Sequence, residues 1–149
     1  MELTAFTDYS LRLLIYLGQN PNSLASIDEV AEYYKVSRHH IAKIVNRLRE
    51  LGYIETIRGK NGGIRLGKDP QDINVGTLVL QTEPHFNIVE CFDPKTNTCT
   101  LNSCCSLKGI LVKARNAFIK TLREHTLEDA LNHPGLSAHF KSSKKELTS

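Results

Sequence analysis

The fold is decided by residues 26–52, which read SIDEVAEYYKVSRHHIAKIVNRLRELG. The apolar residues of this stretch recur at intervals of three and four, the spacing of one helix face. Ser26 and Ser37 stand where helix N-caps belong, and Gly52 stands where the second helix would end. Two short helices joined by residues 35–37 predict a helix-turn-helix.

The flanking segments complete a winged domain. Before the helix pair, residues 3–17 carry apolar side chains at helical spacing. After it, two β-prone runs at residues 53–57 and 64–66 flank the basic, glycine-rich segment 58–63. This pattern is typical of a hairpin, which in a helix-turn-helix protein forms the wing.

The second half of the chain differs from the first in composition and in its predicted secondary structure. A short, largely apolar helix is predicted over residues 75–82. Residues 83–105 contain two prolines and all four cysteines, so we expect an irregular loop. A long helix begins at residue 106, and a thin winged domain offers no internal place to bury its apolar stripe. We assign that stripe to dimerisation: Leu107, Ile110, Leu111, Ala114, Phe118 and Leu122.

We therefore predict a mainly α fold with a small β-hairpin wing, in which a winged helix-turn-helix precedes a long dimerisation helix. The expected segments are a DNA-binding domain over 1–74 and a short helix with a cysteine loop over 75–105. A dimerisation helix with a terminal turn should follow over 106–133, and a disordered tail over 134–149.

Composition excludes several classes of protein. No apolar run is long enough to span a bilayer, and the first residues do not form a secretory signal. We expect a cytoplasmic protein, where thiols are free or metal-bound rather than paired in disulfides. We find no catalytic triad, phosphate loop or convincing carboxylate pair, so no enzyme is predicted.

The charge is distributed unevenly. The chain carries a net charge of +3, yet residues 35–68 hold nine basic residues against Glu50 and Glu55, giving +7 there and −4 elsewhere. A concentrated basic surface is typical of a polyanion-binding face, because contacts with phosphates release condensed counterions. Double-stranded operator DNA is the expected partner. The alternatives are a solvated helix face and a wing that docks on another protein.

The second helix of a helix-turn-helix lies in the major groove, and the wing meets phosphate or the minor groove. Arg pairs with guanine and Asn with adenine. The predicted DNA contacts are Ser37, Arg38, His39, His40, Lys43, Asn46 and Arg47 on the helix, and Arg58, Lys60 and Arg65 on the wing.

Three of the four cysteines form the pattern C-x7-C-x5-C at Cys91, Cys99 and Cys105. The spacing leaves three interpretations open: a zinc site, an iron–sulfur or redox-sensing site, and cysteines with only a structural role. Cys104 and Cys105 cannot easily turn both sulfurs to one centre, so one is a ligand and one is spare. A helix start after Cys105 favours its thiolate.

Together these residues resemble the NsrR family of nitric-oxide-sensing repressors, in the superfamily that also holds the iron–sulfur regulator IscR. The resemblance rests on FTDYSLRLLIYL at 6–17, RGKNGGIRLGK at 58–68 and the cysteine pattern, and covers about residues 1–131. It implies a homodimer with one 4Fe–4S cluster per subunit on Cys91, Cys99 and Cys105. It also implies that nitric oxide is the signal and that the cluster-loaded form binds the operator.

The resemblance implies a fourth ligand, Asp8, supplied by the partner subunit. Read from the residues alone, Asp8 is an acid at the positive end of a helix dipole, and that alternative remains. The seven-residue first gap and the additional Cys104 depart from the family pattern. Lys108 stands where the IscR type has a histidine ligand, which argues against that type. A zinc- or thiol-based redox regulator on the same scaffold is the alternative function.

Overall fold

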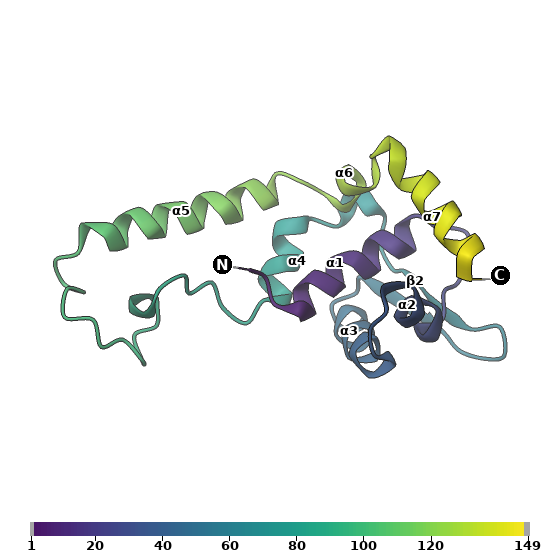
Figure 1. Ribbon diagram of the computed structural model, residues 1–149, viewed down its shortest axis with the longest axis horizontal. Helices are drawn as coiled ribbons and strands as arrows, with labels where there is room; N and C mark the ends of the chain where they lie inside the picture. Colours follow the sequence, from purple (N-terminus) through teal and green to yellow (C-terminus); the bar gives the residue numbers. More distant parts are fainter. Residues whose placement is uncertain (1, 148–149) are drawn as a thin grey trace.

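The computed structural model describes the backbone of residues 2–147 and the side chains of residues 2–140 and 142. It is mainly helical, with one two-stranded antiparallel sheet. A body built from the N-terminal elements, up to residue 82, and the C-terminal helices carries one long helix that projects from it as an arm (Figure 1). None of the helices in residues 2–147 combines the length and apolar character that crossing a bilayer requires.

Three helices form the helix-turn-helix and its support: α1 (Ala5–Gly18), α2 (Ile27–Tyr34) and α3 (Arg38–Glu50). Ser26 and Ser37 cap α2 and α3, each accepting a hydrogen bond from a backbone N–H three residues on, so the predicted caps are confirmed. Lys35 ends α2 in the left-handed conformation, with φ 54°, and turns the chain into α3. Gly52 adopts φ 76°, as expected of a residue just past a helix.

The wing consists of β1 (Ile54–Ile57) and β2 (Gly63–Leu66), paired in antiparallel register with Ile54 opposite Leu66. The wing is joined to the start of the helix pair, because Ala25 and Ile64 exchange both backbone hydrogen bonds, at 3.0 and 2.8 Å. A side chain at position 63 could not fit there, since a Cβ would lie 2.7 Å from the Ala25 oxygen.

One hydrophobic core holds these elements together. Its fully buried members come from α1, α2, α3, the wing and the segment that follows: Leu13, Leu14, Val30, Ile41, Ile44, Leu48, Ile54, Ile64, Ile73 and Leu78. Leu127 and Phe140, far along the sequence, belong to the same cluster. The C-terminal helices therefore pack on the N-terminal domain.

The chain continues through a 3-10 turn, η1 (Pro70–Asp72), into α4 (Val75–Thr82). The irregular segment over residues 83–105, called the thiol loop below, contains one further 3-10 turn, η2 (Glu90–Phe92), and leads to α5 (Ser106–Arg123). The end of α5 crosses α4 so closely that a Cβ on Gly76 would lie 2.6 Å from the Arg123 backbone nitrogen.

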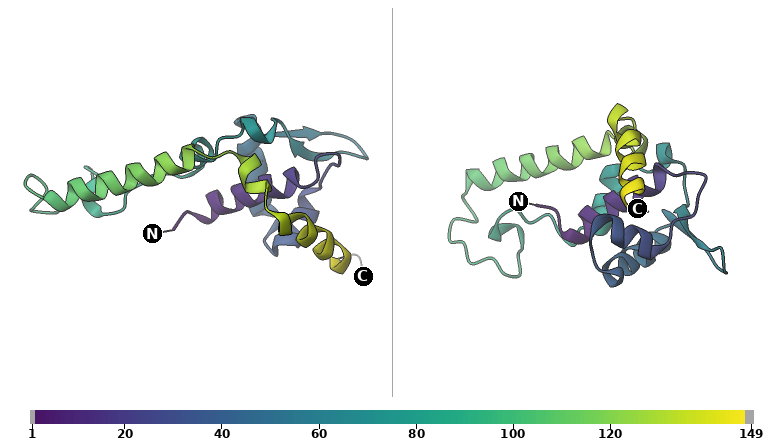
Figure 2. Two further views of the ribbon diagram at one scale, coloured as in Figure 1. Left: turned by 90° about the horizontal axis from the view of Figure 1, so that it is seen from above. Right: turned by 45° about the vertical axis from the view of Figure 1, so that its right-hand side comes forward.

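The arm is α5, and the thiol loop runs from the end of α4 alongside the arm to its far end (Figures 1 and 2). None of the residues of α5, all of which the structure describes, is buried. Leu107 and Ile110, at the start of the predicted stripe, are 58% and 61% exposed, whereas Leu111, Phe118 and Leu122 are partly covered.

Two helices follow the arm, α6 (Leu127–Leu131) and α7 (Pro134–Leu147). The helical turn expected near residues 127–131 is confirmed. The expectation of a disordered tail is wrong for residues 134–147, and residues 148–149 lie outside the described residues. The reason is Phe140, which is buried and stacks on Tyr33 with ring centroids 5.2 Å apart and planes 7° from parallel.

Candidate nucleic-acid interface and thiol loop

The outer side of α3 carries most of the predicted contacts. Six of the seven side chains predicted on this helix are exposed: Ser37, Arg38, His39, Lys43, Asn46 and Arg47. Ile41, Ile44 and Leu48 hold the opposite side in the core. The amphipathic pattern of α3 thus fixes which residues can meet a ligand in solution.

His40 is the exception, and the structure removes it from this exposed set. It is half-buried, and its ring meets Tyr9 of α1 edge-on at 5.5 Å. Its Nε2 atom is buried and has no hydrogen-bond partner among the described residues. The sequence gives only the side of α3 on which His40 lies, and not its contact with another helix. For that reason the sequence predicted an exposed His40.

Two of the exposed arginines have intramolecular partners. Arg38 lies 2.8 Å from the Asp28 carboxylate of α2, with both side chains about two-thirds exposed. Arg47 lies 3.4 Å from Glu50 and 3.5 Å from the backbone oxygen of Gln81 at the end of α4. Exposed pairs of this kind contribute little to stability and exchange readily for phosphate.

The wing presents its three basic residues differently. Arg58 and Lys60 are exposed at the tip, beside Gly59, whose φ of 112° favours glycine. Arg65 is also exposed but donates twice to one carboxylate oxygen of Glu55, at 3.1 and 3.0 Å. The tip is therefore the part of the wing that is most available to an anion.

The wing and α3 are tied to α4 by a residue that sequence reasoning missed. The Tyr53 hydroxyl, just before β1, donates a 2.6 Å hydrogen bond to the side-chain oxygen of Gln81. Tyr53 is buried, and burial raises its pKa. In the sequence, Tyr53 is typical of an ordinary core residue next to a strand. Only its hydrogen bond to Gln81, 28 residues away, reveals the link to α4.

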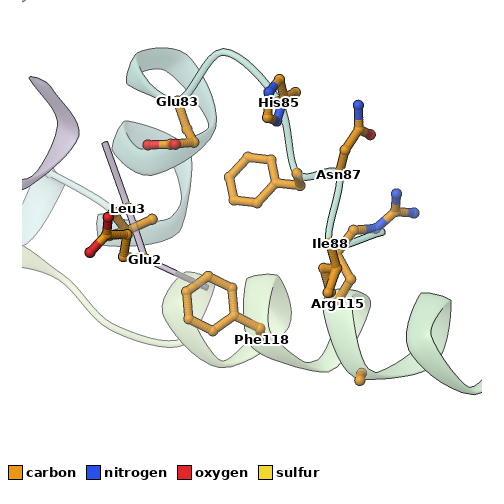
Figure 3. Close-up of a pocket in the computed structure, with 10 residues that line it drawn as sticks. Glu2, Leu3, Glu83, His85, Asn87, Ile88, Arg115 and Phe118 are labelled. Atoms are coloured by element: carbon orange, nitrogen blue, oxygen red, sulfur yellow. The ribbon is translucent and has the colours of Figure 1, made fainter. Parts of the chain in front are cut away.

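The thiol loop begins at a second junction. Glu83 accepts hydrogen bonds from the backbone N–H and the hydroxyl of Thr4, the N-cap of α1, at 3.0 to 3.2 Å. A pocket of about 380 Å³ opens beside it, between the N-terminal residues, the chain after α4 and the side of α5. Glu83, just past the end of α4, and Phe118 of α5 line it (Figure 3).

The four cysteines are all free thiols in or beside this loop. Cys91 lies in η2, Cys99 lies in the irregular chain that follows, and both are half-buried. Cys105 is the N-cap residue of α5 and is half-buried, whereas Cys104 is exposed and its thiol lies 3.7 Å from the Leu101 carbonyl oxygen. Among the described side chains, those of residues 2–140 and 142, no three of His, Cys, Asp or Glu are gathered closely enough to hold a metal ion.

The thiol loop is organised by a carboxylate that the sequence did not single out. Glu90 accepts hydrogen bonds from the backbone N–H and from the hydroxyl of Thr98, the latter at 2.6 Å. These bonds, led by the hydroxyl, lower the pKa of Glu90. The only sequence signal is that each partner directly precedes a cysteine.

Asp8 lies in the first turn of α1. Its carboxylate is held by Arg12, whose Nε and Nη2 atoms lie 3.0 and 2.8 Å from its two oxygens. This hydrogen-bonded pairing raises the pKa of the Arg12 guanidinium. The structure thus brings Asp8 together with Arg12, and not with three other metal-binding side chains of the described chain.

Comparison with known proteins settles the class of molecule. A family model named Rrf2 and described as an iron-dependent transcriptional regulator matches residues 3–133. The chain belongs to the Rrf2 family. The HTH-type transcriptional regulator NsrR of Shouchella clausii is 48% identical over 97% of this chain and 100% of its own length. The regulator of the same name from Bacillus subtilis is 49% identical over 89% of this chain and 92% of its own length.

The solved structure of CymR, the global cysteine regulator of Bacillus subtilis, has a TM-score of 0.69 and 24% identity to this Rrf2 protein. It covers 88% of this chain and 96% of its own, and at that identity it shows the fold alone. The predicted winged helix-turn-helix fold and the family resemblance are confirmed. As a member of the Rrf2 family, the protein is a DNA-binding transcription regulator.

Proposed function

We propose that this Rrf2 protein is a homodimeric repressor that binds its operator when loaded with a 4Fe–4S cluster and releases it in response to nitric oxide. The observation that carries the proposal is the whole-chain identity of 48% to a relative named NsrR, together with free thiols in one loop. The name NsrR belongs to the relative, and its sensing role is extended to this chain by that similarity.

The DNA contacts of the proposal come from the exposed basic residues of α3 and the wing tip. The N-terminal part of the recognition helix would meet base edges, through Arg38, His39 and Lys43. Arg58 and Lys60 would meet phosphate or the minor groove. Two heads held by a dimer would read a pseudo-palindromic operator, with half-sites one helical turn apart.

The exposed apolar side of α5 supports the homodimer. Leu107 and Ile110 remain more than half exposed in the single chain. Burying such side chains against an equivalent helix stabilises association by roughly 1.5 kcal/mol or more for each fully covered residue. A two-fold interface places the same face of both arms in contact.

The donor set of the thiol loop fits an iron–sulfur cluster in its chemistry, because thiolates are the usual ligands of such clusters. Cys91, Cys99 and Cys105 would hold the cluster. Cys105 is favoured over Cys104 because it is half-buried at the N-terminus of α5, where the helix dipole stabilises a thiolate. When bound, the cluster would supply iron that reacts with nitric oxide.

Asp8 is proposed as the fourth ligand, acting toward the cluster of the other subunit. To act as a ligand, the Asp8 carboxylate would have to leave Arg12 and bind the cluster. Because the Asp8–Arg12 ion pair is exposed, breaking it costs little free energy. Asp8 and Thr4 share the first turn of α1, and Glu83 fixes Thr4. A change at Asp8 therefore acts on a helix that packs directly on α3.

The test is anaerobic purification followed by visible absorption spectroscopy and titration with nitric oxide. Operator binding is measured on the same samples by fluorescence anisotropy. We expect a coloured protein whose absorbance bleaches as operator affinity falls, by about 150-fold if the coupling is near 3 kcal/mol. Affinity that nitric oxide leaves unchanged refutes the proposal. A colourless protein containing zinc, or one governed by thiol oxidation, would support the alternative redox regulator.

A further inference from the structure

The cysteine spacing poses a geometric question. Seven residues separate Cys91 from Cys99, and an open loop of that length leaves its ends free to separate. Closing a flexible loop costs conformational entropy, which ligand binding must otherwise supply. A contact that closes the loop before ligand binding would bring the Cys91 and Cys99 thiols near each other in advance.

The structure contains such a contact at the Glu90 carboxylate. It accepts from the Thr98 backbone N–H and, at 2.6 Å, from the Thr98 hydroxyl. Hydrogen bonds to an ionised carboxylate are stronger than neutral ones. Since Glu90 precedes Cys91 and Thr98 precedes Cys99, the bonds join the residues adjacent to the two thiols.

The residues between the two thiols are folded into a turn that matches this closure. Asp93 accepts from the Lys95 backbone N–H at 2.9 Å through its side chain and from the Asn97 N–H at 3.1 Å through its carbonyl. The Asn97 side chain in turn accepts from the Cys99 N–H at 3.0 Å. The intervening chain is thus compact, with no extended stretch to push the ends apart.

We propose that Glu90 is a positioning residue, which with Thr98 forms a clasp that holds Cys91 and Cys99 together before any ligand binds. The clasp is the pair of hydrogen bonds from Thr98 to the Glu90 carboxylate. It accounts for how this chain accommodates a long gap between its first two thiols. Its role in cluster binding rests on the proposed function, whereas its effect on thiol proximity does not.

The test compares how fast Cys91 and Cys99 are oxidised to a disulfide in the metal-free, fully reduced protein. Diamide is the oxidant, and it takes up two electrons and two protons as one disulfide forms. Alkylation and peptide mass spectrometry then distinguish this disulfide from those that involve Cys104 or Cys105. Glu90→Gln keeps an acceptor oxygen but removes the charge that strengthens both bonds from Thr98. Weakening two bonds by half amounts to about one net hydrogen bond, so formation of the Cys91–Cys99 disulfide should slow about fivefold.

Three further variants make the comparison specific. Thr98→Val removes the hydroxyl and keeps the N–H, so it should slow pairing no more than Glu90→Gln does. Thr98→Ser keeps the hydroxyl and should pair at the parent rate. Glu124→Gln removes an exposed carboxylate at the other end of α5 and is the matched charge control. Circular dichroism verifies that all variants are folded.

A second readout uses reconstituted protein and the release of iron to a chelator. Glu90→Gln should release iron faster than the parent, and Thr98→Ser at the parent rate. If the parent takes up no cluster, the proposed function fails, while disulfide pairing still tests the clasp. If Glu90→Gln pairs its thiols as fast as the parent, the clasp is refuted, whatever the cluster does.

Discussion

Replacing glycine with alanine should have opposite effects on stability at two positions, Gly76 where α4 crosses α5 and Gly109 on the exposed part of α5. A Cβ on Gly76 of α4 would lie 2.5 Å from the Cγ, 2.6 Å from the nitrogen and 2.9 Å from the Cα of Arg123. Two of these atoms are backbone and cannot swing away. Gly76→Ala must therefore push the arm off α4. On Gly109 of α5, by contrast, a Cβ would meet no described atom within 4 Å.

The magnitudes follow from packing and helix propensity. Overpacking a tight contact costs about 1–3 kcal/mol. Alanine gains up to about 1 kcal/mol over glycine inside a helix, less near an end, and Gly76 is the second residue of α4. We expect Gly76→Ala to lower the free energy of unfolding by about 1–2 kcal/mol. Gly109→Ala should raise it by about 0.5–1 kcal/mol.

Urea unfolding followed by circular dichroism provides the measurement. Both variants and the parent are compared at one protein concentration, because the proposed dimer would have an apparent stability that depends on concentration. Separation of the arm should also break the hydrogen bond of 2.7 Å from the Asn74 side chain to the Arg123 carbonyl. If Gly76→Ala proves as stable as Gly109→Ala, the close crossing and the reasoning built on it are wrong.

Four other perturbations have defined outcomes. Tyr53→Phe removes the 2.6 Å hydrogen bond to α4 and should reduce the unfolding free energy by about 1 kcal/mol in urea denaturation. Phe140→Ala empties a buried site and should cost up to about 3 kcal/mol, with hydrogen exchange showing the loss concentrated in α7. Arg58→Ala should reduce the slope of log operator affinity against log salt by about 1, whereas Arg65→Ala, with its carboxylate partner on the wing, should change it less. The pKa of Asp129 is lowered, chiefly because its carboxylate accepts a hydrogen bond from the backbone N–H of Thr126, the N-cap of α6. Its contribution to stability is therefore present above the unfolded pKa and is lost as the pH falls through the lower folded pKa. Asp129→Asn should therefore flatten the decline of the thermal midpoint in acid, and an unchanged acid profile would contradict that assignment.

The helix-turn-helix and wing could be predicted because their signals are local. The Ser26 and Ser37 caps, the spacing of the apolar residues and the glycine beyond α3 all act within a few residues. The Glu29 side chain, three residues after Ser26, accepts a hydrogen bond from the Tyr16 hydroxyl of α1. That bond is a contact between helices, which no local pattern predicts.

The elements that sequence reasoning missed all depend on distant partners. The tail becomes α7 because Phe140 fits against Tyr33 and Tyr16, from two different helices. His40 turns inward because Tyr9 of α1 offers a ring to pack against. The thiol ligands were proposed from spacing and family resemblance, whereas the role of Glu90 required its hydrogen-bond partner to be seen. A polar residue eight positions away carries no periodic signal.

The arm has a mechanical consequence that its length alone determines. With 18 residues, α5 extends for about 27 Å between its crossing with α4 and the thiol loop. A rod of that length converts a displacement of about 1 Å at the loop into a rotation of only about 2° at the crossing. Anything that fastens the loop therefore fixes the angle between arm and body far more finely than the same contact made near the crossing. Thermal motion at the crossing is correspondingly magnified at the far end of α5, so a contact that restrains this end restrains the orientation of the arm most tightly.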